Sequence, residues 1–121
     1  MNINEFCSRY AAGQRDFRNL NLMAANLRNL SLVGVNLSGA NLTKANLTRT
    51  NLSHANLTGA ILIGANLSET NLTKANLTDA NLSNTNLDDA NLSQAYLRGA
   101  LRNQCYTSVS SGSDAKGSSG S

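Results

Sequence analysis

The chain has 121 residues, a formal net charge of +3 and only 14% charged residues, and it contains neither proline nor tryptophan. This length allows one domain, and a net charge so close to zero excludes strongly anionic and strongly cationic proteins. With one histidine, two cysteines and no phosphate-binding loop or nucleophile motif, the composition predicts no enzymatic activity, no cofactor and no metal site.

The chain opens with a pattern typical of a short amphipathic helix. Its apolar residues follow the i, i+3, i+4 spacing of one helix face: Ile3, Phe6, Cys7, Tyr10 and Ala11. Asn2, with Glu5 three residues later, is typical of a helix N-cap, and Gly13 of a helix end. We expect residues 2–13 to form a capping helix, because the open end of the repeat array that follows would leave leucines and backbone groups uncovered.

A five-residue period dominates the rest of the chain. Leucine occupies every fifth position from Leu22 to Leu97, and Phe17 holds the slot before them. A continuous helix would turn successive leucines about 140° apart, and a continuous strand would flip them to opposite sides. A backbone that bends once per pentapeptide instead points every leucine at a common axis, as in a solenoid.

The other positions of the pentapeptide agree with this interpretation. The residue two before each leucine is small or aliphatic: Ala at ten positions, Thr50, Thr70 and Thr85, and Leu20, Leu30 and Val35. Between these two inward positions lies Asn in thirteen of seventeen repeats, facing outward by alternation. The sequence therefore predicts that Leu57→Lys destabilises the fold strongly and that Asn56→Lys costs little.

From Ala40-Asn41-Leu42-Thr43-Lys44 through Ala90-Asn91-Leu92-Ser93-Gln94, the chain resembles the pentapeptide repeat family. The resemblance implies an all-β fold, a right-handed quadrilateral β-helix with four pentapeptides per coil, so that residue i stacks on residue i+20. With about 4.8 Å between paired strands, residues 15–101 are expected to form slightly more than four coils.

The segment from Tyr10 to Phe17 also resembles the start of small bacterial, notably cyanobacterial, members of this family. No apolar run is long enough to span a membrane, and no secretory signal is evident. We therefore expect a soluble, cytoplasmic protein.

The register decays after Leu97, because Arg102 replaces the next central leucine. We expect residues 102–121 to form a closing segment and a flexible Gly/Ser tail, whose composition is typical of a linker. Unless something covers it, the last coil, around Leu92, Leu97 and Leu101, is expected to expose core leucines and an unpaired edge. Some members of the family dimerise through this end, which implies an end-to-end homodimer through four residues: Tyr96, Leu97, Leu101 and Tyr106. The alternative is a monomer that Tyr106 closes locally.

Stacking by twenty residues places five charged residues on one face: Arg28, Arg49, Glu69, Asp88 and Asp89. The N-terminal half of this face is basic and its C-terminal half acidic. One interpretation is an exposed ion pair between Arg49 and Glu69 worth at most about 1 kcal/mol. The other is a polarised surface that orients a charged partner.

Two isoleucines, Ile61 and Ile63, flank the inward Leu62 where Asn and Ser or Thr are usual. Isolated exposed apolar residues are normal. Together with Met23, two coils away, they are alternatively a small contact patch.

These surfaces predict a non-enzymatic, rigid interaction or scaffold module with an unknown protein partner. The alternative is a DNA mimic that binds a type II topoisomerase, as the resemblance to members linked to fluoroquinolone resistance implies. A charge of +3 disfavours a substitute for anionic DNA. Direct nucleic-acid binding is also disfavoured, because the three tyrosines are too dispersed for a stacking groove.

Overall fold

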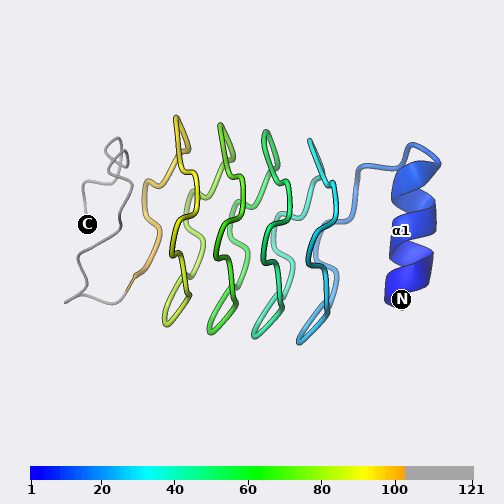
Figure 1. The fold of residues 1–121 in the computed structure, drawn as a ribbon, viewed down its shortest axis with the longest axis horizontal. Helices are drawn as coiled ribbons and strands as arrows, with labels where there is room; N and C mark the ends of the chain where they lie inside the picture. The colour runs from blue at the N-terminus through cyan, green and yellow to red at the C-terminus, as the bar shows by residue number, and fades with distance from the viewer. Residues whose placement is uncertain (103–121) are drawn as a thin grey trace.

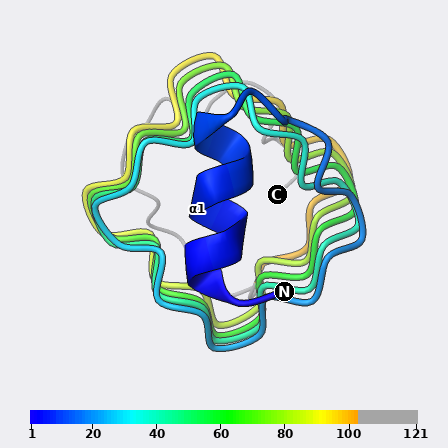
Figure 2. The ribbon, with the colours of Figure 1, turned by 90° about the vertical axis from the view of Figure 1, so that its right-hand side faces the viewer.

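The computed structural model describes residues 1–102 of the chain. These residues form one helix, α1 (Ile3–Ala11), followed by a stack of four-sided coils (Figures 1 and 2). Within this range no strand is longer than one residue, and fourteen parallel single-residue bridges join the coils, from Asp16↔Asn36 to Asn81↔Leu101. The described part of the molecule is therefore a rod with α1 at its N-terminal end. Apart from Arg102, the predicted closing segment lies outside the described residues.

Every bridge joins residue i to residue i+20, which confirms the predicted stacking of one coil on the next. Leu22 donates its N–H to the carbonyl of Asn41 over 2.8 Å, and Asn41 donates its N–H to the carbonyl of Leu20 over 2.9 Å. The same exchange recurs on all four sides of the coil. Side chains twenty residues apart therefore form straight columns along the rod.

Each pentapeptide contains a tight turn at a corner of the coil. In the turn from Leu22 to Ala25 the N–H of Ala25 donates to the carbonyl of Leu22 over 3.1 Å, and Ala24 has a φ of 58°. A positive φ at the second central residue is typical of a type II turn. Gly39 occupies an equivalent position with a φ of 69°, and a Cβ there would require the side chain of Asn19 in the preceding coil to move.

The boundaries of α1 follow from its capping groups. The N–H of Glu5 donates to Oδ1 of Asn2 over 2.8 Å, which confirms the predicted N-cap. The helix ends at Ala11, and Gly13 has a φ of 107°, a conformation that glycine adopts readily. Ala11, which the apolar stripe included, is exposed. Among residues 1–102 no helix has the length and apolar character needed to cross a bilayer.

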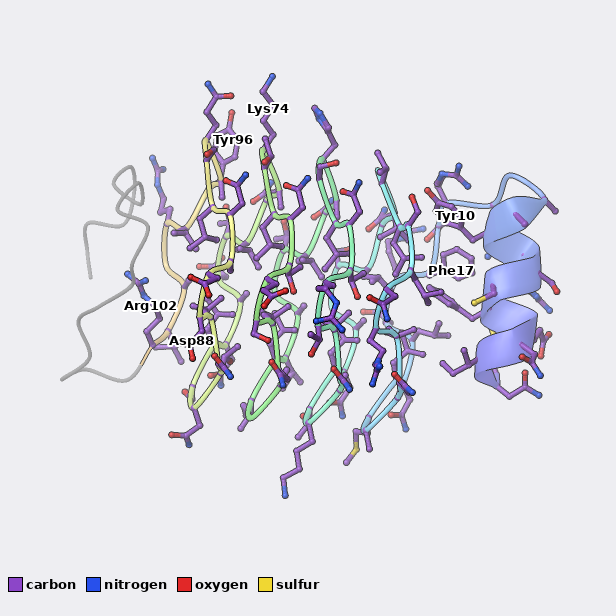
Figure 3. The ribbon with its side chains drawn as sticks, viewed as in Figure 1. Tyr10, Phe17, Lys74, Asp88, Tyr96 and Arg102 are labelled. Carbon is purple, nitrogen blue, oxygen red and sulfur yellow. The ribbon has the colours of Figure 1, made fainter. Side chains whose placement is uncertain are left out.

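Figure 2 shows α1 lying across the N-terminal end of the coil. Phe6 is fully buried, and its ring centroid lies 4.6 Å from that of Phe17, in a tilted arrangement typical of aromatic pairs. The hydroxyl of Tyr10 donates to the carbonyl of Val33 over 2.8 Å, and the guanidinium of Arg15 lies 3.7 Å from the centre of the Tyr10 ring. Tyr10 and Phe17 thus connect the helix to the first coil (Figure 3).

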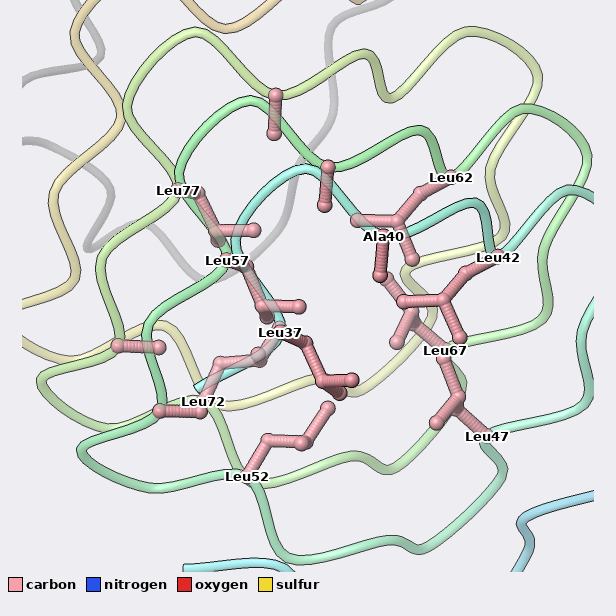
Figure 4. Close-up of a cluster of buried hydrophobic side chains, with 14 of the residues drawn as sticks. Leu37, Ala40, Leu42, Leu47, Leu52, Leu57, Leu62, Leu67, Leu72 and Leu77 are labelled. Atoms are coloured by element: carbon pink, nitrogen blue, oxygen red, sulfur yellow. The ribbon is translucent and has the colours of Figure 1, made fainter. Parts of the chain in front are cut away.

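The core is a column of leucines that fills the interior of the rod (Figure 4). From Leu22 to Leu82 every central leucine is at most 3% exposed. The alanines two residues before the central leucines are equally buried from Ala40 to Ala80. This burial confirms the predicted register of the pentapeptide.

Threonine takes the place of the inward alanine without leaving a buried polar group unpaired. The hydroxyl of Thr50 donates to the carbonyl of Leu27, and that of Thr70 to the carbonyl of Leu47, both over 2.7 Å. Both threonines are fully buried. A buried hydroxyl without a partner would destabilise the fold by roughly 1–3 kcal/mol, so these bonds explain why threonine is tolerated there.

Candidate interaction surfaces

The predicted charged face is one corner of the rod, and all five of its residues are exposed. We call this surface the charged corner: Arg28, Arg49, Glu69, Asp88 and Asp89. Nη1 of Arg49 lies 3.5 Å from Oε1 of Glu69, with both side chains about half exposed (50% and 52%). Nε of Arg49 also donates to Oδ1 of Asn29 over 3.1 Å. Within residues 1–102 the three other members form no ion pair, so the structure brings together only the central two.

The outward asparagines have a structural role that the sequence analysis missed. In all thirteen repeats that carry Asn, Oδ1 accepts a hydrogen bond from the N–H of the residue two positions later; for Asn56 the donor is Thr58, at 3.0 Å. This is the side-chain bond of an Asx turn. The asparagine ladder therefore stabilises the corners, and the expectation that Asn56→Lys costs little is revised.

Four outward positions between residues 21 and 101 lack this asparagine: Ser31, Ile61, Tyr96 and Leu101. None of these side chains makes the Asx bond. Asp16, at the start of the column that ends with Tyr96, keeps the bond by accepting from the N–H of Arg18 over 3.2 Å. At Ile61, Tyr96 and Leu101 the chain thus presents an apolar or aromatic side chain where the fold favours asparagine.

Ile61 and Ile63 are each only partly buried, and both lie on the outside of the rod. Met23, which is 53% exposed, lies two coils from Ile63 in the same column, with Thr43 between them. Thr43 therefore separates Met23 from the isoleucines, and only Ile61 and Ile63 belong to the same turn.

The predicted C-terminal contact surface is only partly where the sequence placed it. Leu97 points inward and is 5% exposed, and Leu92 is 3% exposed, so neither of these leucines is uncovered. Leu101 is 57% exposed and is not a core leucine. It occupies the outward asparagine slot and bridges Asn81, because the inward slot of its pentapeptide belongs to Arg102. Tyr106 lies outside the described residues.

Several backbone N–H groups of the last coil have no partner within the described part of the chain. The N–H groups of Leu87, Leu92 and Leu97 find no acceptor among residues 1–102, whereas the equivalent groups of earlier coils donate to the next coil. An unpaired edge of this kind is available for pairing with another chain segment.

A groove runs beside the last three coils, with a volume of about 920 Å³. One wall is a corner that carries His54, Lys74 and Gln94, and the other includes Thr78 and Arg98. Tyr96 lies between these walls and is 61% exposed; it projects from the same edge of the rod as Lys74 (Figure 3).

The sequence analysis did not bring the groove residues together, although stacking by twenty residues places Gln94 on Lys74 and Lys74 on His54. His54, the single histidine of the chain, is exposed. Among the described residues no group of three potential metal ligands forms.

One exposed ion pair lies at the N-terminal end of the rod. Nε of Arg18 donates to Oδ1 of Asp16, and Nη2 to Oδ2, both over 2.9 Å. These side-chain bonds hold the pKa of the Asp16 carboxyl below its ordinary value. The pair is solvent-exposed, so its energetic contribution is small.

Comparison with known proteins gives one family and several solved structures. The family described as pentapeptide repeats (8 copies) matches residues 21–59, 50–89 and 75–100. A pentapeptide repeat protein from the thylakoid lumen of Arabidopsis thaliana is 32% identical, with a TM-score of 0.69 over 71% of this chain and 60% of that chain. A pentapeptide repeat protein from Nostoc PCC 7120 is 30% identical, with a TM-score of 0.53 over 84% of this chain and 96% of that chain.

HetL, a pentapeptide repeat protein involved in heterocyst differentiation regulation in Nostoc sp. strain PCC 7120, is 43% identical. That match covers 83% of this chain and 46% of HetL, with a TM-score of 0.39. No curated protein matches the chain. The match to the Arabidopsis protein covers less than two thirds of that protein's length. The structural neighbours imply that the coil is a right-handed quadrilateral β-helix.

Proposed function

This chain belongs to the pentapeptide repeat family, and we propose that it acts as a rigid interaction or scaffold module rather than as an enzyme. Proteins of this family are generally structural or interaction modules. Coil-to-coil hydrogen bonds on every side hold the backbone, so surface side chains keep fixed positions relative to one another. Such a surface suits recognition, because little conformational entropy is lost when a partner binds.

The charged corner is the observation that carries this proposal. Its two arginines lie on the first two coils and its three carboxylates on the last two, with one ion pair between them. A corner with opposite charges at its two ends distinguishes the two orientations of a charged partner, because the wrong orientation places like charges together. The partner we propose is a protein with a complementary charge pattern.

The test is affinity capture from the native host with the corner reversed in polarity. The reversed variant carries four substitutions: Arg28→Glu, Arg49→Glu, Glu69→Arg and Asp88→Arg. It keeps the net charge of the chain, so non-specific attraction is unchanged. A control variant exchanges Lys44→Asp and Asp79→Lys on other corners. We expect wild type and control to retain a protein that the reversed variant loses; identical captures by all three would contradict the proposal.

We further infer that α1 caps the N-terminal coil. Phe6 is fully buried against Phe17, and Tyr10 donates to a first-coil carbonyl. These contacts come from residues that precede the repeats, and they cover the end at which leucines would otherwise meet water.

The C-terminal edge supports a homodimer formed end to end. The last-coil N–H groups that have no acceptor among residues 1–102, with the exposed Tyr96 and Leu101 beside them, are a surface that a second copy could pair with. Sedimentation at micromolar concentration tests this: a dimer that Leu101→Glu dissociates would support the contact, and a monomer in both proteins would exclude it.

A type II topoisomerase is not the partner that we propose. The groove and the N-terminal half of the charged corner are cationic, and the whole chain carries a charge of +3, so no face imitates a continuous line of DNA phosphates. We expect no inhibition in a gyrase supercoiling assay.

A further inference from the structure

At Tyr96 an exposed aromatic ring replaces the side chain that elsewhere in the column accepts the hydrogen bond of the turn. The residues before it in its column, from Asp16 to Asn76, all accept the N–H two positions later. Tyr96 has no side-chain acceptor in that position, and its ring is 61% exposed. The bond is worth roughly 0.5–1.5 kcal/mol, so the fold alone favours asparagine here. Departures from local structural preference are expected mainly at functional sites.

The groove around Tyr96 is lined by cations from both walls. Lys74 stands on one wall and Arg98 on the other, and neither makes an ion pair with any residue from 1 to 102. Among residues 1–102 no carboxylate lines the groove. Asp79, next to the lining Thr78, places its carboxylate against the backbone of Gly99.

The polar groups between the cations are uncharged. Gln94 and Thr78 supply amide and hydroxyl groups that donate or accept hydrogen bonds. The lining therefore attracts anions, and it also offers an aromatic surface for aliphatic or planar groups.

We propose that this groove binds an acidic peptide segment of a partner protein. The inference rests on the proposed function as an interaction module, and it adds a second surface and the chemistry of its ligand. Carboxylates of the segment would pair with Lys74 and Arg98, and the stem of a side chain between them would pack on the Tyr96 ring. Exposed ion pairs of this kind give specificity and fast association rather than high affinity, so we expect a weak, salt-sensitive complex.

A peptide fits these features better than a nucleic acid does. Single-stranded nucleic acids are held by several aromatic residues on which successive bases stack, and the groove offers one tyrosine. Tyr10, the other tyrosine within the described residues, lies at the opposite end of the rod (Figure 3).

The chain offers a closely matched pair of variants for the test. Lys74 and Lys44 are both exposed corner residues with a φ of 60°, but only Lys74 lines the groove. Lys74→Glu and Lys44→Glu change the net charge equally, so their difference reports the groove. Tyr96→Asn restores the column consensus and removes the ring.

The experiment titrates the full chain into fluorescein-labelled hexaglutamate and follows fluorescence anisotropy, with hexaglutamine and a ten-residue oligothymidylate as further probes. We expect saturable binding of hexaglutamate that Lys74→Glu weakens about fivefold to tenfold, equivalent to about 1 to 1.4 kcal/mol. Tyr96→Asn should weaken it about threefold or more without lowering the melting temperature, since a stacking surface is lost and a turn bond gained. Lys44→Glu should change it less than about twofold.

Three results would overturn the proposal: no saturable binding of hexaglutamate, equal weakening by Lys44→Glu and Lys74→Glu, or tighter binding of oligothymidylate. Failure here is distinct from failure of the charged-corner proposal, because the groove variants leave that corner intact and the variant with the reversed corner leaves the groove residues intact.

Discussion

The two ends of the described rod differ in the residues that form them. At the N-terminal end, residues outside the repeats pack on the first coil, with Phe6 fully buried and Tyr10 hydrogen-bonded to it. At the C-terminal end the repeat pattern itself continues into the last coil, and the chain places Tyr96 and Leu101 on the outside. The repeat therefore suffices to build the interior, while residues that depart from the repeat pattern determine which side chains lie at each end.

The largest effect is expected when one charge is placed in the interior of a middle coil. Leu57 is fully buried, so Leu57→Lys should destabilise the fold by more than about 4 kcal/mol through an unpaired buried ammonium. Leu97→Lys, in the last coil, should cost less, because a lysine side chain near the end of the rod reaches water more readily. Urea unfolding followed by circular dichroism measures both. Equal losses would mean that the interior of the last coil is as closed to water as that of the middle coil.

A change at the N-terminal end should rank next. Phe6→Ala removes a fully buried ring that packs on Phe17, and we expect a loss of about 3–5 kcal/mol. Ala11→Ser, on an exposed position of the same helix, is the control and should change the stability little. If Phe6→Ala unfolds at the wild-type denaturant concentration, α1 does not cap the coil.

A moderate effect is expected for the column that runs from Asp16 to Tyr96. Asn56→Lys removes the acceptor for the N–H of Thr58 and should cost about 1 kcal/mol. Tyr96→Asn, forty residues later in the same column, should restore an equivalent bond and raise the melting temperature slightly. An unchanged melting temperature for Asn56→Lys would show that the asparagine ladder contributes little to stability.

The smallest effect concerns the exposed carboxylate of Asp16. Bonds from Arg18 lower its pKa in the folded state from the ordinary value of 3.8, so the unfolded chain binds a proton more readily. The stabilising contribution is therefore complete above the ordinary pKa and is lost as the pH falls through the lowered one. Asp16→Asn keeps an acceptor for the turn. We expect this variant to lose less stability than the wild type as the pH falls from about 5 into the acid range. If the urea midpoints of the variant and the wild type fall in parallel as the pH is lowered, the ion pair between Asp16 and Arg18 does not contribute to stability.

The register of the fold could be predicted from the sequence because it depends on few, repeated choices. A leucine at every fifth position and a small residue two before it admit only an arrangement in which both point inward, and the burial of Leu57 and Ala55 agrees. The N-cap at Asn2 was equally local, since it depends on residues three apart.

What the sequence did not reveal depends on backbone geometry. Alternation placed Asn56 on the outside correctly, but only the turn brings the N–H of Thr58 to its side chain. Leu101 was mistaken for a core residue because residue type was given more weight than register. The groove escaped notice because its walls come from residues twenty or more apart, such as Lys74 and Arg98, whose approach depends on the shape of two neighbouring corners.

Because four pentapeptides close one coil, the number of pentapeptides between two surface residues decides in which direction from the rod axis each of them points. Adding or removing one pentapeptide would keep every leucine inside, yet it would turn all later surface columns by a quarter of a revolution about the rod axis. A five-residue deletion between Lys74 and Gln94, for example, would stack Gln94 on Glu69 and dismantle the groove while leaving the core filled. A change in length by one pentapeptide can thus replace one surface by another in proteins of this architecture, while the packing of the hydrophobic interior stays the same.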